Sequence, residues 1–155
     1  MTILNNWIKI NASPEKVWKV LSDLEAVEHY DPLVTRSRLV GSSHSGIGAA
    51  RPMDLKPVGW LEERATEWEP NESLTIELYK CSTTPVKSLK HSYTLKPDGE
   101  GTLVTERMEY VLKFGPIGKL MDALMVRRKW DQGIKGFFAG LKSFVVNRGP
   151  SSLDK

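Results

Sequence analysis

Apolar residues at helical spacing mark the C-terminal part of the chain, from Ile117 to Val146. This segment contains no proline and is bounded by Gly115-Pro116 and Gly149-Pro150. The apolar positions of its second half fall on one side of a helix with about 3.6 residues per turn. They are Trp130, Ile134, Phe137, Phe138, Leu141, Phe144 and Val145. Such a face needs a large apolar partner, and the strand-like sequence before it predicts that a sheet is this partner.

The first half of the segment carries a second apolar stripe, formed by Ile117, Leu120, Met121, Leu124 and Met125. On a helical wheel this stripe is rotated by roughly 130° from the stripe of the second half. The change falls at residues 126–133, around Arg127-Arg128-Lys129. We expect either a kink that gates a cavity mouth or a first half that packs on something other than the sheet. Met121 and Met125 suit a flexible lip at that mouth or a dimer contact, because methionine adapts to varied apolar surfaces.

Three glycines, Gly133, Gly136 and Gly140, flank the second stripe. Each lowers helix stability by up to about 1 kcal/mol relative to alanine. Two explanations are open: a neighbouring backbone packs closely there, or the missing side chains leave room for a ligand.

Before the long helix, the pattern predicts one strand and two short helices. Ile3 to Ile10 forms the strand, and Ser13 caps a helix over Pro14–Leu24 whose first position suits proline. Trp18 is expected to anchor that helix to the rest of the fold. A shorter helix over Ala26–Tyr30 ends at Asp31-Pro32, because a residue before proline avoids helical geometry.

From Val34 onward, apolar and polar residues alternate in short runs separated by turns, a pattern typical of an antiparallel sheet. The predicted strands are Val34–Gly41, Gly48–Leu55, Gly59–Trp68, Ser73–Cys81, Lys87–Lys96 and Thr102–Lys113. The whole order predicts an α+β domain over residues 1–148, followed by a disordered tail at 149–155. With 155 residues the chain is long enough for one domain with a real core.

Composition excludes several classes of protein. Cys81 is the only cysteine, so an internal disulfide is impossible, and the chain has no apolar run of membrane-spanning length. We therefore expect a cytoplasmic protein, as a monomer or homodimer. Residues 1–115 hold 14 basic and 16 acidic side chains, whereas residues 116–155 hold 8 basic and 3 acidic, a net charge of +5. This basic segment fits an anionic ligand, a membrane surface or a solvated helix face, and it lacks the interleaved aromatic residues typical of RNA-binding motifs.

The sequence contains no strong catalytic, metal or cofactor motif. His29, His44 and His91 lie far apart in unlike contexts, and there is no cluster of cysteine and histidine. The chain also lacks a GxSxG elbow and a complete phosphate loop, since Arg51 stands where the third glycine would be. We expect no metal and no cofactor.

The last predicted hairpin is the best candidate for chemistry. One face of its first strand carries His91, Tyr93 and Leu95, and one face of the second carries Val104, Glu106, Met108, Tyr110 and Leu112. The apolar members indicate that both faces point inward. A loop at Asp98–Gly101 would pair Tyr93 with Glu106 and place His91 diagonally from Glu106.

Three roles are open for this group. An imidazole, a carboxylate and phenols in an apolar cavity suit acid–base work on a carbonyl ligand, or orientation of a ligand by hydrogen bonds. The purely structural alternative is that Glu106 binds an arginine, such as Arg64. Glu63 and Arg64 point to opposite faces of their strand, so one of them is expected to be inward and paired.

The chain also resembles a known family at motifs spread over almost its whole length. They lie at residues 10–18, 21–24, 30–32, 48–51, 63–70, 101–102 and 141–142. In these positions it is similar to the polyketide cyclase/dehydrase family of the START-like (SRPBCC) superfamily. The resemblance implies a helix-grip fold: a strongly curved antiparallel sheet of about seven strands wrapped around the C-terminal helix, with a cavity between them.

The resemblance implies binding of a small hydrophobic or amphipathic molecule, such as a lipid, polyketide or quinone. The alternatives are an enzyme of cyclase, dehydratase or hydrolase type using His91, Glu106 and a tyrosine, or an interaction protein that docks through its basic helix. The expected ligand contacts are Ile76, Leu78, His91, Tyr93, Glu106, Met108, Tyr110, Met121, Met125, Ile134, Phe137, Phe138 and Leu141.

Overall fold

The protein is represented by a computed structural model that describes residues 1–82 and 85–147. The predicted tail at 149–155 lies outside the described residues. No helix in the described ranges is long and apolar enough to cross a membrane.

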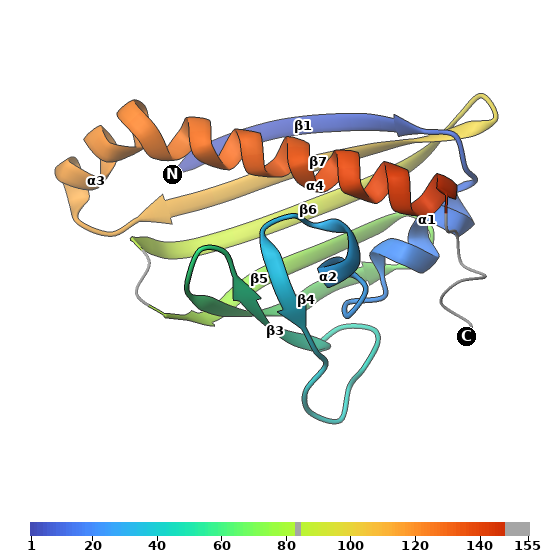
Figure 1. Ribbon diagram of the computed structural model, residues 1–155, viewed down its shortest axis with the longest axis horizontal. Helices are drawn as coiled ribbons and strands as arrows, with labels where there is room; N and C mark the ends of the chain where they lie inside the picture. Colours follow the sequence, from blue (N-terminus) through green and yellow to red (C-terminus); the bar gives the residue numbers. More distant parts are fainter. Residues whose placement is uncertain (83–84, 148–155) are drawn as a thin grey trace.

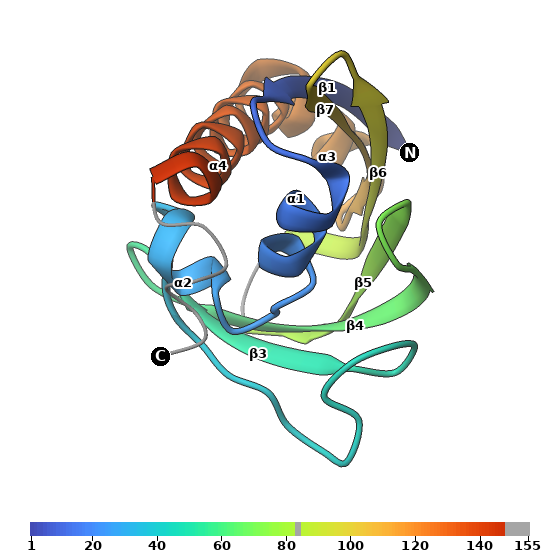
Figure 2. The ribbon, with the colours of Figure 1, turned by 90° about the vertical axis from the view of Figure 1, so that its right-hand side faces the viewer.

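Seven strands form one antiparallel sheet in the order β1-β7-β6-β5-β4-β3-β2. They are β1 (Thr2–Ile10), β2 (Val34–Ser37), β3 (Ala50–Leu55), β4 (Trp60–Glu69), β5 (Ser73–Cys81), β6 (Val86–Asp98) and β7 (Gly101–Leu112). Consecutive strands pair with one another from β2 to β7, and β1 closes the sheet beside β7. Figure 2 shows the sheet curling around the helices, which confirms the predicted α+β helix-grip fold.

Two short helices follow β1, namely α1 (Pro14–Leu21) and α2 (Val27–Tyr30). The α1 helix begins as predicted, because Ser13 Oγ accepts a hydrogen bond from the Lys16 amide at 3.3 Å and Pro14 occupies the first turn. Trp18 is buried and its ring meets Trp68 of β4 edge to face, with the centroids 5.6 Å apart. This contact attaches α1 to the sheet, in the way that the spacing of its apolar residues indicated.

The C-terminal helix runs without interruption through α3 (Gly115–Met121), a π-helical turn η1 (Asp122–Val126) and α4 (Arg127–Asn147). In Figure 1, α4 crosses the sheet along its length and α3 lies beyond the end of the sheet. The apolar stripe of α4 is buried, with Leu141 fully inaccessible to solvent. A π-turn holds one residue more than an α-turn, so it changes which side of the helix the following positions occupy.

The flanking glycines bring α4 close to the segment that follows α2. A Cβ atom on Gly140 would lie 1.8 Å from the Tyr30 carbonyl oxygen, and one on Gly136 would lie 3.2 Å from Pro32 Cγ. A side chain at Gly140 is therefore impossible without a backbone shift. Close packing explains Gly136 and Gly140, whereas Gly133 lines the cavity described next.

Candidate ligand cavity

A cavity of about 530 Å³ lies between the concave face of the sheet and the C-terminal helix. Nine of the thirteen contacts expected from the sequence line it: Leu78, His91, Tyr93, Glu106, Met108, Met121, Met125, Ile134 and Phe137. The remaining wall is mostly apolar and comes from five strands (β2, β3, β4, β5 and the start of β6), from α2 and the loops that follow α2 and β3, and from η1 and α4. The cavity thus combines a largely apolar wall with a few polar groups, which is the usual construction of a small-molecule site.

The other four expected contacts lie outside the lining. Ile76 and Leu141 are buried in the core, and Phe138 borders a shallow depression on the other side of α4. Tyr110 donates a hydrogen bond to Asp122 Oδ1, and burial together with this carboxylate raises the pKa of Tyr110 to about 12. All four side chains are buried, but none of them lines the cavity.

A buried ion pair stands at one side of the cavity. Arg51 on β3 lies directly opposite Glu63 on β4. The Arg51 Nε and Nη2 groups donate to Glu63 Oε2 at 3.1 and 2.9 Å. Both side chains are buried and both line the cavity. Two charges removed from water in this way require each other, because either one alone would be strongly disfavoured.

A second pair lies beside the first, on β6 and β7. Tyr93 is paired with Glu106 in the register, as the loop length predicted. His91 lies diagonally from Glu106, and its Nδ1 atom is 2.5 Å from Glu106 Oε1. His91 Nε2 is also 3.7 Å from Glu63 Oε1, so the imidazole joins the two pairs. The partner of Glu106 is therefore a histidine, whereas Arg64 pairs with Glu62 and lies over the Tyr79 ring.

The surroundings change the protonation of this polar cluster. Burial acts to lower the pKa of His91, but the hydrogen bond to Glu106 and the charges of both glutamates outweigh it and raise the pKa. Burial also raises the pKa of Tyr93 well above its ordinary value, with a further contribution from Glu106. The two glutamates therefore favour the protonated imidazole, and burial favours the neutral phenol.

Two polar atoms in this region are buried and have no hydrogen-bond partner among the described residues: Tyr30 Oη and Glu106 Oε2. The Tyr30 and Tyr93 rings both rest on Phe137, with centroids 5.5 and 5.6 Å from it. An unsatisfied buried polar atom costs about 1–3 kcal/mol, and more when it is charged. Native proteins keep such atoms when something else, such as water or a ligand, meets them.

Sequence reasoning missed Arg51 as a site residue. Alternation along β3 places Arg51 on the same face as Met53 and Leu55, which would have indicated an inward arginine. The expectation for Glu63 and Arg64 was that one is inward and paired, and Glu63 is that residue. Its partner could not be named without the register that sets Glu63 opposite Arg51.

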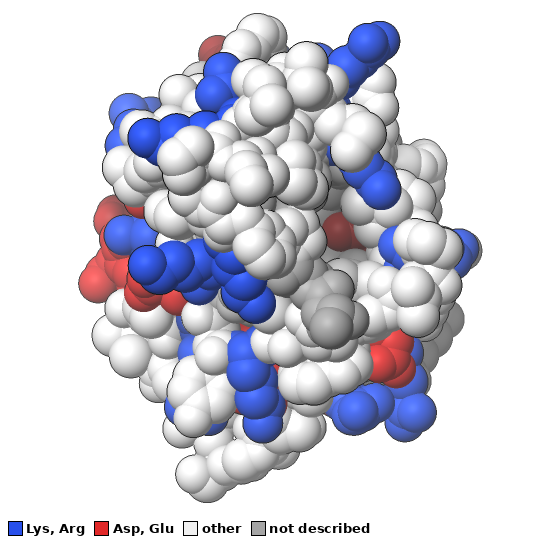
Figure 3. Space-filling view, turned by 90° about the vertical axis from the view of Figure 1, so that its left-hand side faces the viewer, with Lys and Arg blue, Asp and Glu red and all other residues white. Residues whose placement is uncertain are grey.

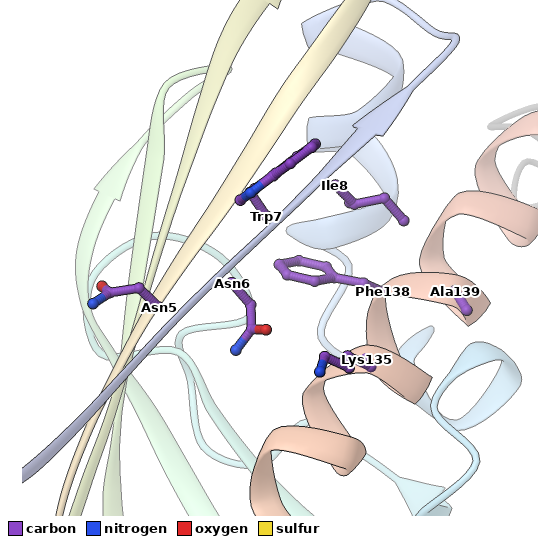
Figure 4. A pocket seen from close by; sticks show the side chains of 7 residues that line it. All are labelled: Asn5, Asn6, Trp7, Ile8, Lys135, Phe138 and Ala139. Atoms are coloured by element: carbon purple, nitrogen blue, oxygen red, sulfur yellow. The ribbon is translucent and has the colours of Figure 1, made fainter.

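A second, shallower depression of about 310 Å³ lies between β1 and α4 (Figure 4). Figure 4 shows Phe138 of α4 directed toward β1, with Ile8 and Asn6 directed toward the helix. Asn6 Nδ2 donates to Asp131 Oδ1 at 3.2 Å, so its polar group is already satisfied. This depression has none of the buried, charged groups that distinguish the main cavity.

Comparison with known proteins places this architecture among relatives. Uncharacterized proteins of Mycobacterium tuberculosis and Mycobacterium bovis are 22% identical over 147 residues, which cover 94% of this chain and 86% of theirs. The crystal structure of TTHA0849 from Thermus thermophilus matches with a TM-score of 0.80 at 20% identity, covering 94% of this chain and 97% of that one. A START superfamily protein from Mycobacterium smegmatis matches with a TM-score of 0.77 at 15% identity, covering 92% and 96%.

Similarity at these identities establishes the fold, and the family follows from a separate match. The profile of the family described as polyketide cyclase / dehydrase and lipid transport matches residues 1–145. Because this match spans the sheet, both short helices and nearly all of the long helix, the chain belongs to that family.

Proposed function

We propose that this protein binds a small, mainly apolar molecule through a neutral hydroxyl group that reaches the polar cluster. Family membership and the apolar cavity support a general role in binding hydrophobic ligands. The volume of about 530 Å³ falls within the range of about 300–1,000 Å³ that is usual for ligand pockets. A lipid, a polyketide or a quinol with such a group satisfies these conditions.

The observation that carries the proposal is the unpartnered Oε2 atom of Glu106. An ionised carboxylate only accepts hydrogen bonds, so its missing partner must be a donor. Glu63 and Glu106 already have the basic partners Arg51 and His91. We therefore infer that the ligand group is a neutral donor, a hydroxyl rather than a carboxylate or an amine.

The position of the cluster sets the orientation of the ligand. Val86 pairs with Leu112, next to α3, whereas Tyr93 pairs with Glu106 farther along the same strands. Val58 and Met125, the most exposed apolar members of the cavity wall, mark its mouth. The hydroxyl group therefore enters first, and the apolar body fills the space between the cluster and the mouth.

Hydroxypyrene, methoxypyrene and pyrenecarboxylate test this proposal, because they share one fluorescent apolar body. Hydroxypyrene is expected to bind about tenfold more tightly than methoxypyrene, since a hydrogen bond to a charged group contributes about 1.5–3 kcal/mol. Glu106→Gln should reduce that preference to within about threefold. Met108→Leu is the matched control, because it changes an apolar wall residue at nearly constant volume and should keep the preference. Equal affinities for the wild type, or tightest binding of pyrenecarboxylate, would contradict the proposal.

Acid–base catalysis is a second candidate, favoured by the short contact between His91 Nδ1 and Glu106 Oε1. A carboxylate that orients an imidazole is a common arrangement in general acid catalysis, and Tyr93 lies parallel to the imidazole with centroids 6.1 Å apart. Native mass spectrometry of gently purified protein distinguishes the candidates. If the bound molecule is released with unchanged mass after incubation, the result supports binding alone. If the wild type converts the molecule into a product of different mass and His91→Gln does not, the result supports catalysis.

A further inference from the structure

Most of the apolar stripe of α3 and η1 faces outward, whereas its member Met121 packs against the core. Ile117, Leu120 and Leu124 are 67%, 60% and 74% exposed. Met125 and Phe114, the residue that precedes α3, are exposed to a similar extent. The buried side of this segment consists of Gly118, Asp122 and Val126, at intervals of four residues. The segment therefore turns Gly118, Asp122 and Val126 inward and most of its larger apolar residues toward solvent.

Buried polar contacts fix this orientation. The Asp122 carboxylate accepts a hydrogen bond from Thr2 Oγ1 of β1 at 2.6 Å and a second one from the Tyr110 hydroxyl of β7. A Cβ atom on Gly118 would lie 2.2 Å from the Lys113 carbonyl oxygen, so this close approach requires glycine. The outward face is consequently part of the fold, since rotating the helix would break both hydrogen bonds to Asp122.

The charges around the stripe have one sign. Five exposed cations lie in the same segment: Lys113, Lys119, Arg127, Arg128 and Lys129. The one acidic residue between positions 113 and 129 is Asp122, which is buried. Figure 3 looks at this end of the molecule and shows Lys and Arg side chains beside a hollow in the surface. The segment thus presents an apolar centre with a positive border.

We propose that this surface docks on an anionic phospholipid bilayer. The docking face comprises the apolar residues Phe114, Ile117, Leu120, Leu124 and Met125 and the five cations. Exposed apolar side chains next to cations are the features by which a helix lies in a membrane interface, with the apolar groups at the acyl boundary and the cations at the headgroups. A second copy of the chain fits less well, because an isologous contact would bring the same cations together.

The docking face adjoins the mouth of the cavity. Met125 belongs to both, and the exposed Lys129 also lines the cavity. Across the mouth, Val58 is 85% exposed and the neighbouring Lys56 is exposed too. Docking would therefore set the cavity opening on the bilayer, where an apolar ligand can pass without crossing water. Docking of this face on a bilayer would not depend on which ligand the cavity holds.

Flotation with sealed vesicles tests the docking face directly. One set contains phosphatidylcholine alone, and the other contains phosphatidylcholine with about a third phosphatidylglycerol, at low and high salt. Wild-type protein is expected to float with the anionic set at low salt, at least tenfold more strongly than with the neutral set. Leu120→Glu with Leu124→Glu should reduce this partition at least tenfold. Lys119→Gln with Arg128→Gln should reduce it about 25-fold, at roughly fivefold for each cation.

Ile47→Glu is the matched control, because Ile47 is also exposed (69%) but lies in the loop between β2 and β3, away from α3. It should float like the wild type. Circular dichroism and thermal midpoints confirm that each variant is folded. Failure of the wild type to bind anionic vesicles, or an equal loss in Ile47→Glu, overturns the proposal. A dimer by light scattering that Leu124→Glu dissociates, without vesicle binding, would assign the face to self-association and would likewise overturn it.

Discussion

The two halves of the C-terminal helix have similar sequence patterns and opposite environments. In α4 the stripe around Phe137 and Leu141 is buried against the sheet and α2. In α3 and η1 the stripe around Leu120 and Leu124 is exposed, although its spacing is equally regular. Hydrophobic periodicity thus predicts a helix and its apolar side in both halves. It does not identify what covers that side.

The difference between the halves comes from what faces the sheet. Along α4, large apolar side chains enter the space between the strands and the helix. Along α3 and η1, Gly118 and Asp122 take that place, and Asp122 satisfies groups on β1 and β7. A regular apolar stripe left exposed while the opposite side is tied down indicates a surface that serves contact rather than folding.

The sharpest test of this comparison truncates one leucine in each half. Leu141→Ala should lower the free energy of unfolding by about 2–5 kcal/mol, because it removes a fully buried side chain and leaves a cavity. Leu124→Ala should change it by less than about 0.5 kcal/mol, because its side chain is already in solvent. Chemical denaturation of both variants measures the two values. Similar losses of unfolding free energy for the two substitutions would mean that Leu124 of η1 packs against something in the folded protein, and would contradict the contrast.

Much of the fold could be predicted from the sequence because its signals are local. Ser73–Cys81 was predicted with the observed bounds, since leucine and isoleucine alternate there with polar residues. The first helix begins at Pro14 as expected, but it ends at Leu21 rather than Leu24. The strand predicted over Val34–Gly41 is shorter, because regular pairing stops at Ser37 and only Val40 bridges to Ala50.

Only the part of the candidate site that lies on one hairpin, formed by β6 and β7, could be predicted from the sequence. The loop length fixed the register of Tyr93 and Glu106, and with it the neighbourhood of His91. Arg51 was not predicted as a site residue, because its role depends on the pairing of β3 with β4 and on the curvature that brings β4 near β6. Such contacts depend on how the whole sheet curves, and a local sequence pattern does not show that curvature. The predicted ligand contacts themselves stay predictions until a bound molecule is seen.

Asp122→Asn tests what holds the exposed half in place. Although burial acts in the opposite direction, hydrogen bonds from Thr2 and Tyr110 and the charge of Arg127 lower the pKa of Asp122. A lowered folded pKa stabilises the protein above the unfolded pKa of about 3.9, and this contribution is lost as pH falls through the folded value. The variant should therefore cost about 2 kcal/mol at pH 7 and progressively less below about pH 4.

Hydrogen exchange and a matched variant complete the Asp122 test. The loss of protection in Asp122→Asn should concentrate in α3 and η1 and spare the buried half of α4. Asp131→Asn is the control, because it disrupts a surface ion pair with Lys135 and should cost less than about 1 kcal/mol. Equal loosening along the whole helix would show that both halves depend on the same contacts.

The smallest expected change in unfolding free energy comes from His91→Gln, which tests how far α4 shields the polar cluster from water. Phe137 of α4 contacts Tyr93, and Tyr93 stacks on His91, so the buried half of the helix shields the imidazole from water. The titratable and charged groups near His91 are Glu106, Glu63, Arg51, Tyr93 and Asp31. Burial favours the neutral imidazole, whereas the two glutamates favour the cation and raise the pKa of His91 overall.

A histidine with a raised folded pKa stabilises the protein fully below its unfolded pKa of about 6.5, and the contribution is lost as pH rises through the folded pKa. Gln carries no charge at any pH, so the deficit in unfolding free energy of His91→Gln should be largest near pH 6 and shrink toward pH 9. Urea denaturation across this range measures it, with His44→Gln, at an exposed histidine, as the matched variant. A deficit that grows with pH would mean that desolvation outweighs the two glutamates. The imidazole would then be neutral, the cluster would carry a net negative charge, and a cationic ligand group would become the better match for Glu106.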